Sequence, residues 1–319
     1  MTPSNCSVHS DVMEILVTTL LMLEFGLGLL ANAIALWTFF FRLKVWKPYV
    51  VYLFNLVMAD LLLTICLPFH ITFYLRHKKW SSGRTSCQAL LFLLSLSRGV
   101  GVAFLTAVAL DRYFRVVHPR LKVNLLSPRW ARAISGCVWL LMMALTHQSL
   151  FVPKAARNTT ECRSFYPRED FSFGVIWKES LFLLQFVLPF GLILFCNAAI
   201  IRTLRKRIRD PEKQPKLQRA KALVTVVVVL FGLCFLPSFL ARILMDVFRR
   251  SDSCRMRRVV EHTSDVASSL TYLNSVLNPM VYCFSNPTFR YSYRKVFNTL
   301  RGRGQEAEPR VADLKDSYS

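Results

Sequence analysis

Seven long apolar runs recur along this chain, and they constrain its fold more than any other feature. Each has the roughly 20 residues that a helix needs to cross the hydrocarbon core of a bilayer. Apolar residues make up 53% of the chain, above the ~45–50% of ordinary soluble domains. We therefore expect an all-α membrane protein built as one seven-transmembrane helix bundle. The expected spans are 13–41, 50–74, 88–110, 133–152, 175–201, 222–248 and 263–285.

The charges between these runs predict how the bundle is oriented. One alternating set of loops carries 25 Lys and Arg residues, whereas the other set carries 14. Loops richer in Lys and Arg stay in the cytoplasm, so the N-terminus is expected outside the cell, at the plasma membrane. The 14 outer cations would attract an anionic ligand. Since the basic residues lie in membrane loops, the net charge of +22 does not indicate nucleic-acid binding.

The segments that flank the bundle are short. We expect an extracellular tail at 1–12, which lacks a basic region before the first span and so predicts a retained signal-anchor. The bundle covers 13–285. An amphipathic interfacial helix is expected at 286–301, with a basic face toward anionic membrane lipids. A disordered cytoplasmic tail would occupy 302–319. The apolar stripe of that helix comprises Phe289, Tyr293, Val296, Phe297 and Leu300.

Four of the nine cysteines lie in the predicted outer segments, where disulfides persist. Four cysteines allow three pairings. We favour Cys87–Cys162, which ties the third span to the following outer loop, and Cys6–Cys254, which ties the tail to the last outer loop. Glycosylation sequons begin at Asn5 and Asn158 on the same predicted face.

Ionisable residues within membrane spans are candidates for function. Arg98 is a permanent cation inside the third span, 14 residues before Arg112. That separation is about 21 Å along a helix and returns to nearly the same helix face. Arg98 is therefore expected to point into the bundle and to bind a ligand carboxylate bidentately. The alternatives are an internal ion pair, for example with Glu24, or a water-filled structural pocket.

Polar and proline motifs fall one set to each span, in order. Together these motifs resemble those of the rhodopsin-like G-protein-coupled receptors, over about residues 12–300. The resemblance implies a receptor without enzymatic activity that couples to a heterotrimeric G protein. The motifs are Asn32, Asp60, Cys87, Asp111-Arg112-Tyr113, Trp139, Pro189, the stretch CFLP at 234–237 and NPMVY at 278–282.

The resemblance also implies roles for individual residues. Arg112 would contact the G protein and be held by Asp111, and a polar cluster around Asp60 would hold sodium. Phe235 stands where most of the family has tryptophan, and Gly101 stands where the sodium site usually has serine, which places sodium binding in question. The implied switch residues are Asp111, Arg112, Tyr113, Phe235, Pro237, Asn278, Pro279 and Tyr282. The implied polar cluster is Asn32, Asp60, Asn274, Ser275 and Asn278.

Further stretches, together with Arg98, are DRYFRVVHP at 111–119, CFLPSFLAR at 234–242 and LTYLNSVLNP at 270–279. With these, the chain resembles the receptors for hydroxycarboxylic acids and oxidised fatty acids within this family. The stretches VWKPY at 45–49 and RLKVNLLSP at 120–128 favour the eicosanoid members. These receptors signal through inhibitory G proteins. The resemblance implies a ligand site that includes Arg98, Ser164, Phe165 and Tyr272. Arg242 and His70 are further candidates, although Arg242 could extend its charge to the interface and a single histidine could be structural. An apolar wall for an acyl chain would comprise Leu94, Val102 and Phe69.

Two other classes of membrane protein fit the sequence less well. An organic-anion transporter would use Arg98 as a substrate clamp, but the chain lacks the repeats typical of transporters. A retinal protein would need a lysine in the seventh span, and 259–285 has none. A short-chain hydroxycarboxylic acid stays open as an alternative ligand. The sequence has neither a metal-binding cluster nor a cofactor motif, so no cofactor is expected.

The expected orientation is tested by epitope tags at the two ends. A tag at residue 1 should be stained by antibody on intact cells, because the less basic loops face outward. A tag at residue 319 should be stained only after permeabilisation. The opposite staining pattern would contradict the orientation.

Overall fold

The structure is a computed structural model, and it describes residues 11–78, 80, 82–147, 150, 183–207, 214–248 and 254–301. The described part is helical. Its long helices are α1 (Asp11–Phe41), α2 (Pro48–Leu75), α3 (Arg84–Val117), α4 (Pro128–Thr146), α6 (Leu188–Arg207), α7 (Gln214–Phe248) and α8 (Cys254–Ser285). Three shorter elements accompany them: η1 (Lys122–Leu125), η3 (Leu183–Val187) and α9 (Pro287–Leu300).

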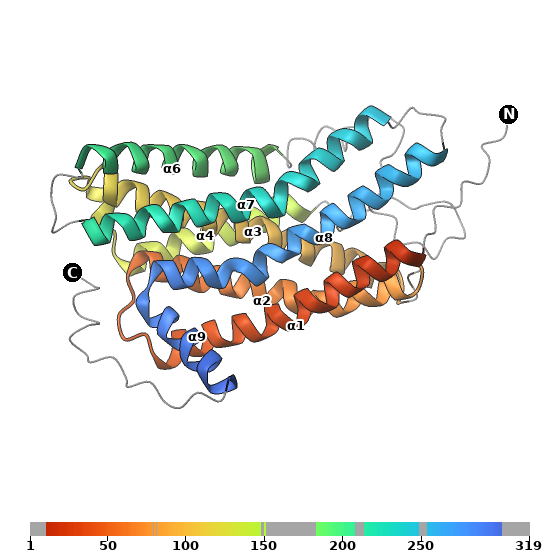
Figure 1. Cartoon of the computed structure of the whole chain (residues 1–319), viewed down its shortest axis with the longest axis horizontal. Helices are drawn as coiled ribbons and strands as arrows, with labels where there is room; N and C mark the ends of the chain where they lie inside the picture. Colours follow the sequence, from red (N-terminus) through yellow and green to blue (C-terminus); the bar gives the residue numbers. More distant parts are fainter. Residues whose placement is uncertain are drawn as a thin grey trace.

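The long helices run side by side along the longest axis of the molecule (Figure 1). Helix α3 packs against α2, α4, α6, α7 and α8, whereas α1 packs against α2, α8 and α9. Helix α9 turns away from the end of α8 beside α1 (Figure 1). This arrangement confirms the expected all-α helix bundle and its short helix after the seventh span.

Five of the helices are long and apolar enough to cross a membrane by length and composition alone. They are α1, α2, α3, α6 and α7. Helices α4 and α8 do not meet that criterion because they carry more polar residues. Helix α4 begins with Arg129 and Arg132, and α8 begins with the charged stretch CRMRRVVEHTSD at 254–265. These two helices complete the seven that the apolar runs predict.

Prolines shape the helices where the sequence places them. Pro68, Pro237 and Pro279 lie inside α2, α7 and α8 without ending them. Pro189 is the second residue of α6, two residues after the end of the π-helical turn η3. A proline ring clashes with the carbonyl four residues earlier, here that of Gln185, and a wider π turn gives it room.

An aromatic cluster joins α1, α2, α8 and α9. Phe39 is 1% exposed, and its ring centroid lies 5.4 Å from that of Phe54 and 4.8 Å from that of Phe289. Phe289 also lies 5.7 Å from Tyr282 at the end of α8. Helix α9 starts where the side chain of Asn286 accepts a hydrogen bond from the backbone N–H of Thr288 at 2.9 Å. The cluster and this cap set the position of α9.

The apolar stripe expected on α9 divides into two parts. Phe289 is fully buried and Tyr293 is half-buried, its hydroxyl donating to the carbonyl of Ala31 at 2.6 Å. Phe297 is 61% exposed. The first part packs on α1, and Phe297 lies on the surface of a helix that is expected at the membrane interface.

Replacing Phe39 by alanine tests the packing of this cluster. Phe39→Ala removes a fully buried ring that touches three other aromatic residues, and truncating a core phenylalanine costs about 3–5 kcal/mol in soluble proteins. The melting temperature of the purified receptor in detergent should fall by several degrees. Phe41→Ala is the matched control, because Phe41 is 75% exposed and should change the melting temperature little. Equal effects of the two variants would contradict the packing.

Candidate functional site

Arg98 lies half-buried in α3, in the part of the bundle where a ligand is expected. Its Nε donates to the carbonyl of Leu94 at 3.4 Å, and its Nη1 donates to the Thr271 hydroxyl at 3.4 Å. The guanidinium carbon lies 5.6 Å from the ring centroid of Tyr272. Both hydrogen bonds are long and both acceptors are neutral. Within the described residues, no carboxylate forms an ion pair with Arg98.

The internal ion pair that would explain Arg98 structurally is therefore not formed with Glu24. Glu24 is 1% exposed in α1, and its carboxyl oxygens have no hydrogen-bond partner among the described residues. The positive charge of Arg98 meets a ring face and neutral oxygens. That arrangement suits a group that accepts an anion from outside the chain.

His70 and Tyr272 lie next to each other beside Arg98. The His70 ring is buried in α2 and makes an edge contact with Tyr272, with centroids 5.5 Å apart. It also lies 5.3 Å from the ring of Tyr74. Three of the predicted ligand-binding residues, Arg98, His70 and Tyr272, thus come from three different helices to one place. Thr271, which the sequence analysis did not single out, joins them because it precedes Tyr272 on α8.

The expected apolar wall is only partly formed. Leu94 and Val102 are buried on α3, one turn on either side of Arg98. Phe69 is 57% exposed, so the expectation that it lines the site with them is wrong. The physical reason is helical geometry: neighbours on a helix are separated by about 100°, and His70 takes the inward position. Arg242 is half-buried on α7.

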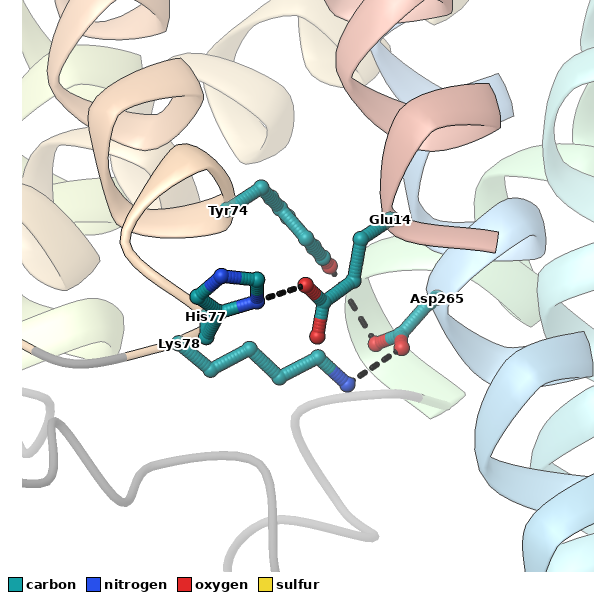
Figure 2. A network of polar contacts seen from close by, with 5 residues as sticks. All are labelled: Glu14, Tyr74, His77, Lys78 and Asp265. Carbon is teal, nitrogen blue, oxygen red and sulfur yellow. Dashed lines mark hydrogen bonds and ion pairs between the residues drawn. The ribbon is translucent and has the colours of Figure 1, made fainter. Parts of the chain in front are cut away.

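A polar network joins the start of α1, the end of α2 and the first part of α8 (Figure 2). The carboxylate of Asp265 on α8 accepts hydrogen bonds from the Lys78 ammonium at 2.6 Å and from the Tyr74 hydroxyl at 3.2 Å. The Nδ1 atom of His77 lies 2.7 Å from the carboxylate of Glu14 on α1. Because His77 and Lys78 are adjacent, the turn that follows α2 links this helix to both α1 and α8.

The backbone of this turn is unusual. His77 and Lys78 have φ values of 51° and 59°, in the left-handed region that non-glycine residues seldom adopt. Such conformations persist where surrounding contacts fix them. The contacts with Glu14 and Asp265 supply that constraint and hold the turn in this conformation.

Deeper in the bundle, the polar cluster forms around Asp60. Its carboxylate accepts two hydrogen bonds from the Asn278 amide, both at 2.9 Å, and one from the Tyr282 hydroxyl at 2.8 Å. Asn32 donates to the carbonyls of Gly28 at 3.0 Å and Ser275 at 3.3 Å. Asn274 is buried on the same helix, α8. The cluster therefore connects α1 and α2 to the segment of α8 that contains Pro279.

The cluster has features for and against a sodium ion. The buried amide oxygens of Asn32, Asn274 and Asn278 have no hydrogen-bond partner among the described residues and could serve as ligands. Both oxygens of Asp60 already accept hydrogen bonds, and Gly101 supplies no oxygen. A side chain would fit at Gly101, since an added Cβ would meet only Leu56, at 3.9 Å. No group of three or more His, Cys, Asp or Glu side chains in the described residues is arranged to hold a metal ion.

Aromatic rings occupy the region where α7 passes η3 and α6. Phe235 lies 4.5 Å from Phe231 and 5.4 Å from Phe186. Phe190 stacks on Phe231 at 5.1 Å. Pro237 follows two residues after Phe235 inside α7. The ring of Phe235 is thus packed into a cluster of phenylalanines next to the proline.

The Asp-Arg-Tyr motif lies near the end of α3 that is remote from Arg98. The Asp111 carboxylate accepts a hydrogen bond from Arg115 Nε at 2.9 Å, whereas Arg112 Nε lies 4.0 Å from it. The Tyr113 hydroxyl lies 3.1 Å from His118 Nε2. Asp111 therefore lies closer to Arg115 than to Arg112, its neighbour in the motif.

Several predicted site residues lie outside the described residues. They are Asn5, Cys6, Asn158, Cys162, Ser164 and Phe165, and the side chain of Cys254 is not described either. Cys87 is disulfide-bonded. Within the described part, Cys66, Cys137, Cys196, Cys234 and Cys283 are free, as expected for cysteines inside spans.

Comparison with known proteins identifies the family. Residues 31–282 match the model of the 7 transmembrane receptor (rhodopsin family). The chain is 67% identical to the human 12-(S)-hydroxy-5,8,10,14-eicosatetraenoic acid receptor, over 99% of each chain. It is 40% identical to human hydroxycarboxylic acid receptor 2, over 96% of this chain and 84% of that receptor. It is 35% identical to human oxoeicosanoid receptor 1, over 92% and 75%. This protein is a multi-pass membrane receptor that belongs to the rhodopsin family of seven-transmembrane receptors.

Proposed function

We propose that this receptor is activated by an oxidised long-chain fatty acid, 12-(S)-hydroxyeicosatetraenoic acid or a close relative, and signals through inhibitory G proteins. The observation that carries the ligand class is the environment of Arg98. A permanent cation lies in the bundle against Thr271 and Tyr272, and no described carboxylate pairs with it. A ligand carboxylate would complete this site with charge-assisted hydrogen bonds.

The relatives support the choice among carboxylic acids. The most similar receptor cited above is named for an eicosanoid, and the two at lower identity are named for hydroxycarboxylic acids and oxoeicosanoids. The buried Leu94 and Val102 beside Arg98 are apolar and suit an acyl chain. A short hydroxycarboxylic acid is the second candidate, because it would use the same cation.

The orientation and partners follow from the same proposal. The N-terminus lies outside, so that Arg98 opens toward the extracellular side and Arg112 faces the cytoplasmic G protein. The bundle spans 13–285, with the tail at 1–12 outside and 302–319 inside. Disulfides Cys87–Cys162 and Cys6–Cys254 and glycans at Asn5 and Asn158 are placed on the outer face. The exposed Arg290, Arg294 and Lys295 of α9 face anionic lipid. The chain performs no catalysis.

The test is ligand-dependent suppression of cyclic AMP in cells that express the receptor. Arg98→Ala should lose response to 12-(S)-hydroxyeicosatetraenoic acid at normal surface expression. Truncating one partner of a buried charge pair costs ~2–5 kcal/mol, which is a loss of roughly 30-fold to several thousand-fold in affinity. Arg98→Lys should recover only part of the response, because lysine lacks the planar fork. The methyl ester of the ligand should fail on the wild-type receptor.

Two controls separate binding from coupling and from ligand length. Arg112→Ala should keep ligand binding and lose cyclic AMP suppression, since Arg112 is about 21 Å along the helix from Arg98. Short hydroxy acids should be much weaker than the eicosanoid on the wild type. Full potency of both Arg98→Ala and the methyl ester would contradict the role of Arg98. A stronger response to short hydroxy acids would favour the second candidate.

A further inference from the structure

At the inner end of α3, the guanidinium of Arg112 lies on an aromatic ring. Its central carbon is 4.3 Å from the ring centroid of Tyr49, the shortest cation–π contact in the described part of the chain. Tyr49 is buried at 8% exposure, and the Arg112 side chain is 18% exposed. A cation over a ring face in a partly dry site is attracted by the ring quadrupole.

The acidic neighbour of Arg112 is engaged elsewhere. Asp111 lies 2.9 Å from Arg115 Nε and 4.0 Å from Arg112 Nε, both measured to the same carboxylate oxygen. Two of the guanidinium nitrogens of Arg112, Nε and Nη2, are buried without a hydrogen-bond partner among the described residues. The ring of Tyr49 therefore meets the face of the guanidinium at 4.3 Å, whereas Asp111 reaches only Nε, at 4.0 Å, the outer limit of an ion pair.

The start of α2 fixes the position of this ring. Pro48 occupies the first turn of α2, and the backbone N–H groups of Val50 and Val51 donate to the carbonyl of Lys47 at 2.9 and 3.3 Å. One turn further, Tyr52 stacks on Phe104 of α3 with centroids 6.4 Å apart. Tyr49 is thus held on a rigid helix start that is packed against α3.

We propose that the ring of Tyr49 holds the side chain of Arg112 in the resting state of this receptor. Arg115 supports this contact, because it pairs with Asp111 and so keeps Asp111 from pairing with Arg112. Tyr49 is a positioning residue that acts through Arg112. When Arg112 leaves the ring to reach the G protein, the cation–π contact is lost, so its strength sets basal activity. This inference rests on the proposed role of Arg112 in coupling and does not depend on the ligand.

The test measures basal nucleotide exchange on an inhibitory G protein, in membranes without ligand, normalised to surface receptor. Tyr49→Leu removes the ring face and should raise the basal rate by roughly 2- to 30-fold. This range corresponds to the loss of one cation–π contact, from an exposed site at the low end to a desolvated site at the high end. Tyr49→Phe keeps a ring and should shift the rate much less. Asp111→Asn should raise it less than Tyr49→Leu. The reverse order would assign the resting hold to Asp111 and overturn the proposal.

Arg115→Gln gives a change of opposite sign. Without the Arg115 charge, Asp111 is available to Arg112, so the basal rate should fall below wild type. Arg115 is 33% exposed, more than Tyr49, so its replacement should disturb folding less. Arg115→Gln therefore decides the question if Tyr49→Leu does not reach the cell surface. An unchanged or raised rate would overturn the proposal.

Arg112→Ala separates this inference from the proposed function. If Arg112→Ala couples normally, the proposed coupling role of Arg112 fails, and the proposal on Tyr49 fails with it. If Arg112→Ala is silent while Tyr49→Leu reaches the surface at the wild-type basal rate, the proposal on Tyr49 alone fails.

Discussion

The hydrocarbon core of a membrane offers no hydrogen bonds, so a spanning chain must satisfy its polar groups internally. The hydrogen bonds that Asp60 accepts meet this constraint most directly. Three hydrogen bonds from two donor groups, the Asn278 amide and the Tyr282 hydroxyl, surround one buried carboxylate and tie α2 to α8. They do so on either side of Pro279, where the helix lacks a backbone donor. The position of the C-terminal part of α8, and of α9 after it, depends on this cluster.

The same constraint applies to Arg98, whose polar surroundings differ from those of Asp60. Asp60 is fully engaged by donors, whereas Arg98 has only long hydrogen bonds to neutral oxygens and a ring face at 5.6 Å. The carboxylate of Asp60 is thus satisfied within the chain, whereas the half-buried cation of Arg98 has no charged partner among the described residues. The two lie on different helices that pack together, α2 and α3. The proposed ligand site and the polar cluster are therefore carried by directly packed helices.

The C-terminal end of α3 shows how a common motif is adapted. The Asp-Arg-Tyr sequence alone predicts an Asp111–Arg112 pair, but Arg115 follows one turn later and competes for the carboxylate. Residues four apart on a helix face each other, so the competition is built into the sequence DRYFR. Tyr49 then meets the cation of Arg112 from a neighbouring helix. The sequence signal for Tyr49 was weak, because nothing in a local motif says which ring lies beside Arg112.

The sequence by itself determined the helical bundle and the inward placement of Arg98, because apolar length and helical period are local properties. The charge asymmetry of the loops predicts the orientation in the same way. Tertiary structure decided which side chains meet. It placed Thr271, Tyr272 and His70 around Arg98, turned Phe69 outward, and brought Tyr49 to Arg112. Contacts between helices depend on the rotation and packing of each helix against its neighbours, and hydrophobic periodicity fixes these only to within a face.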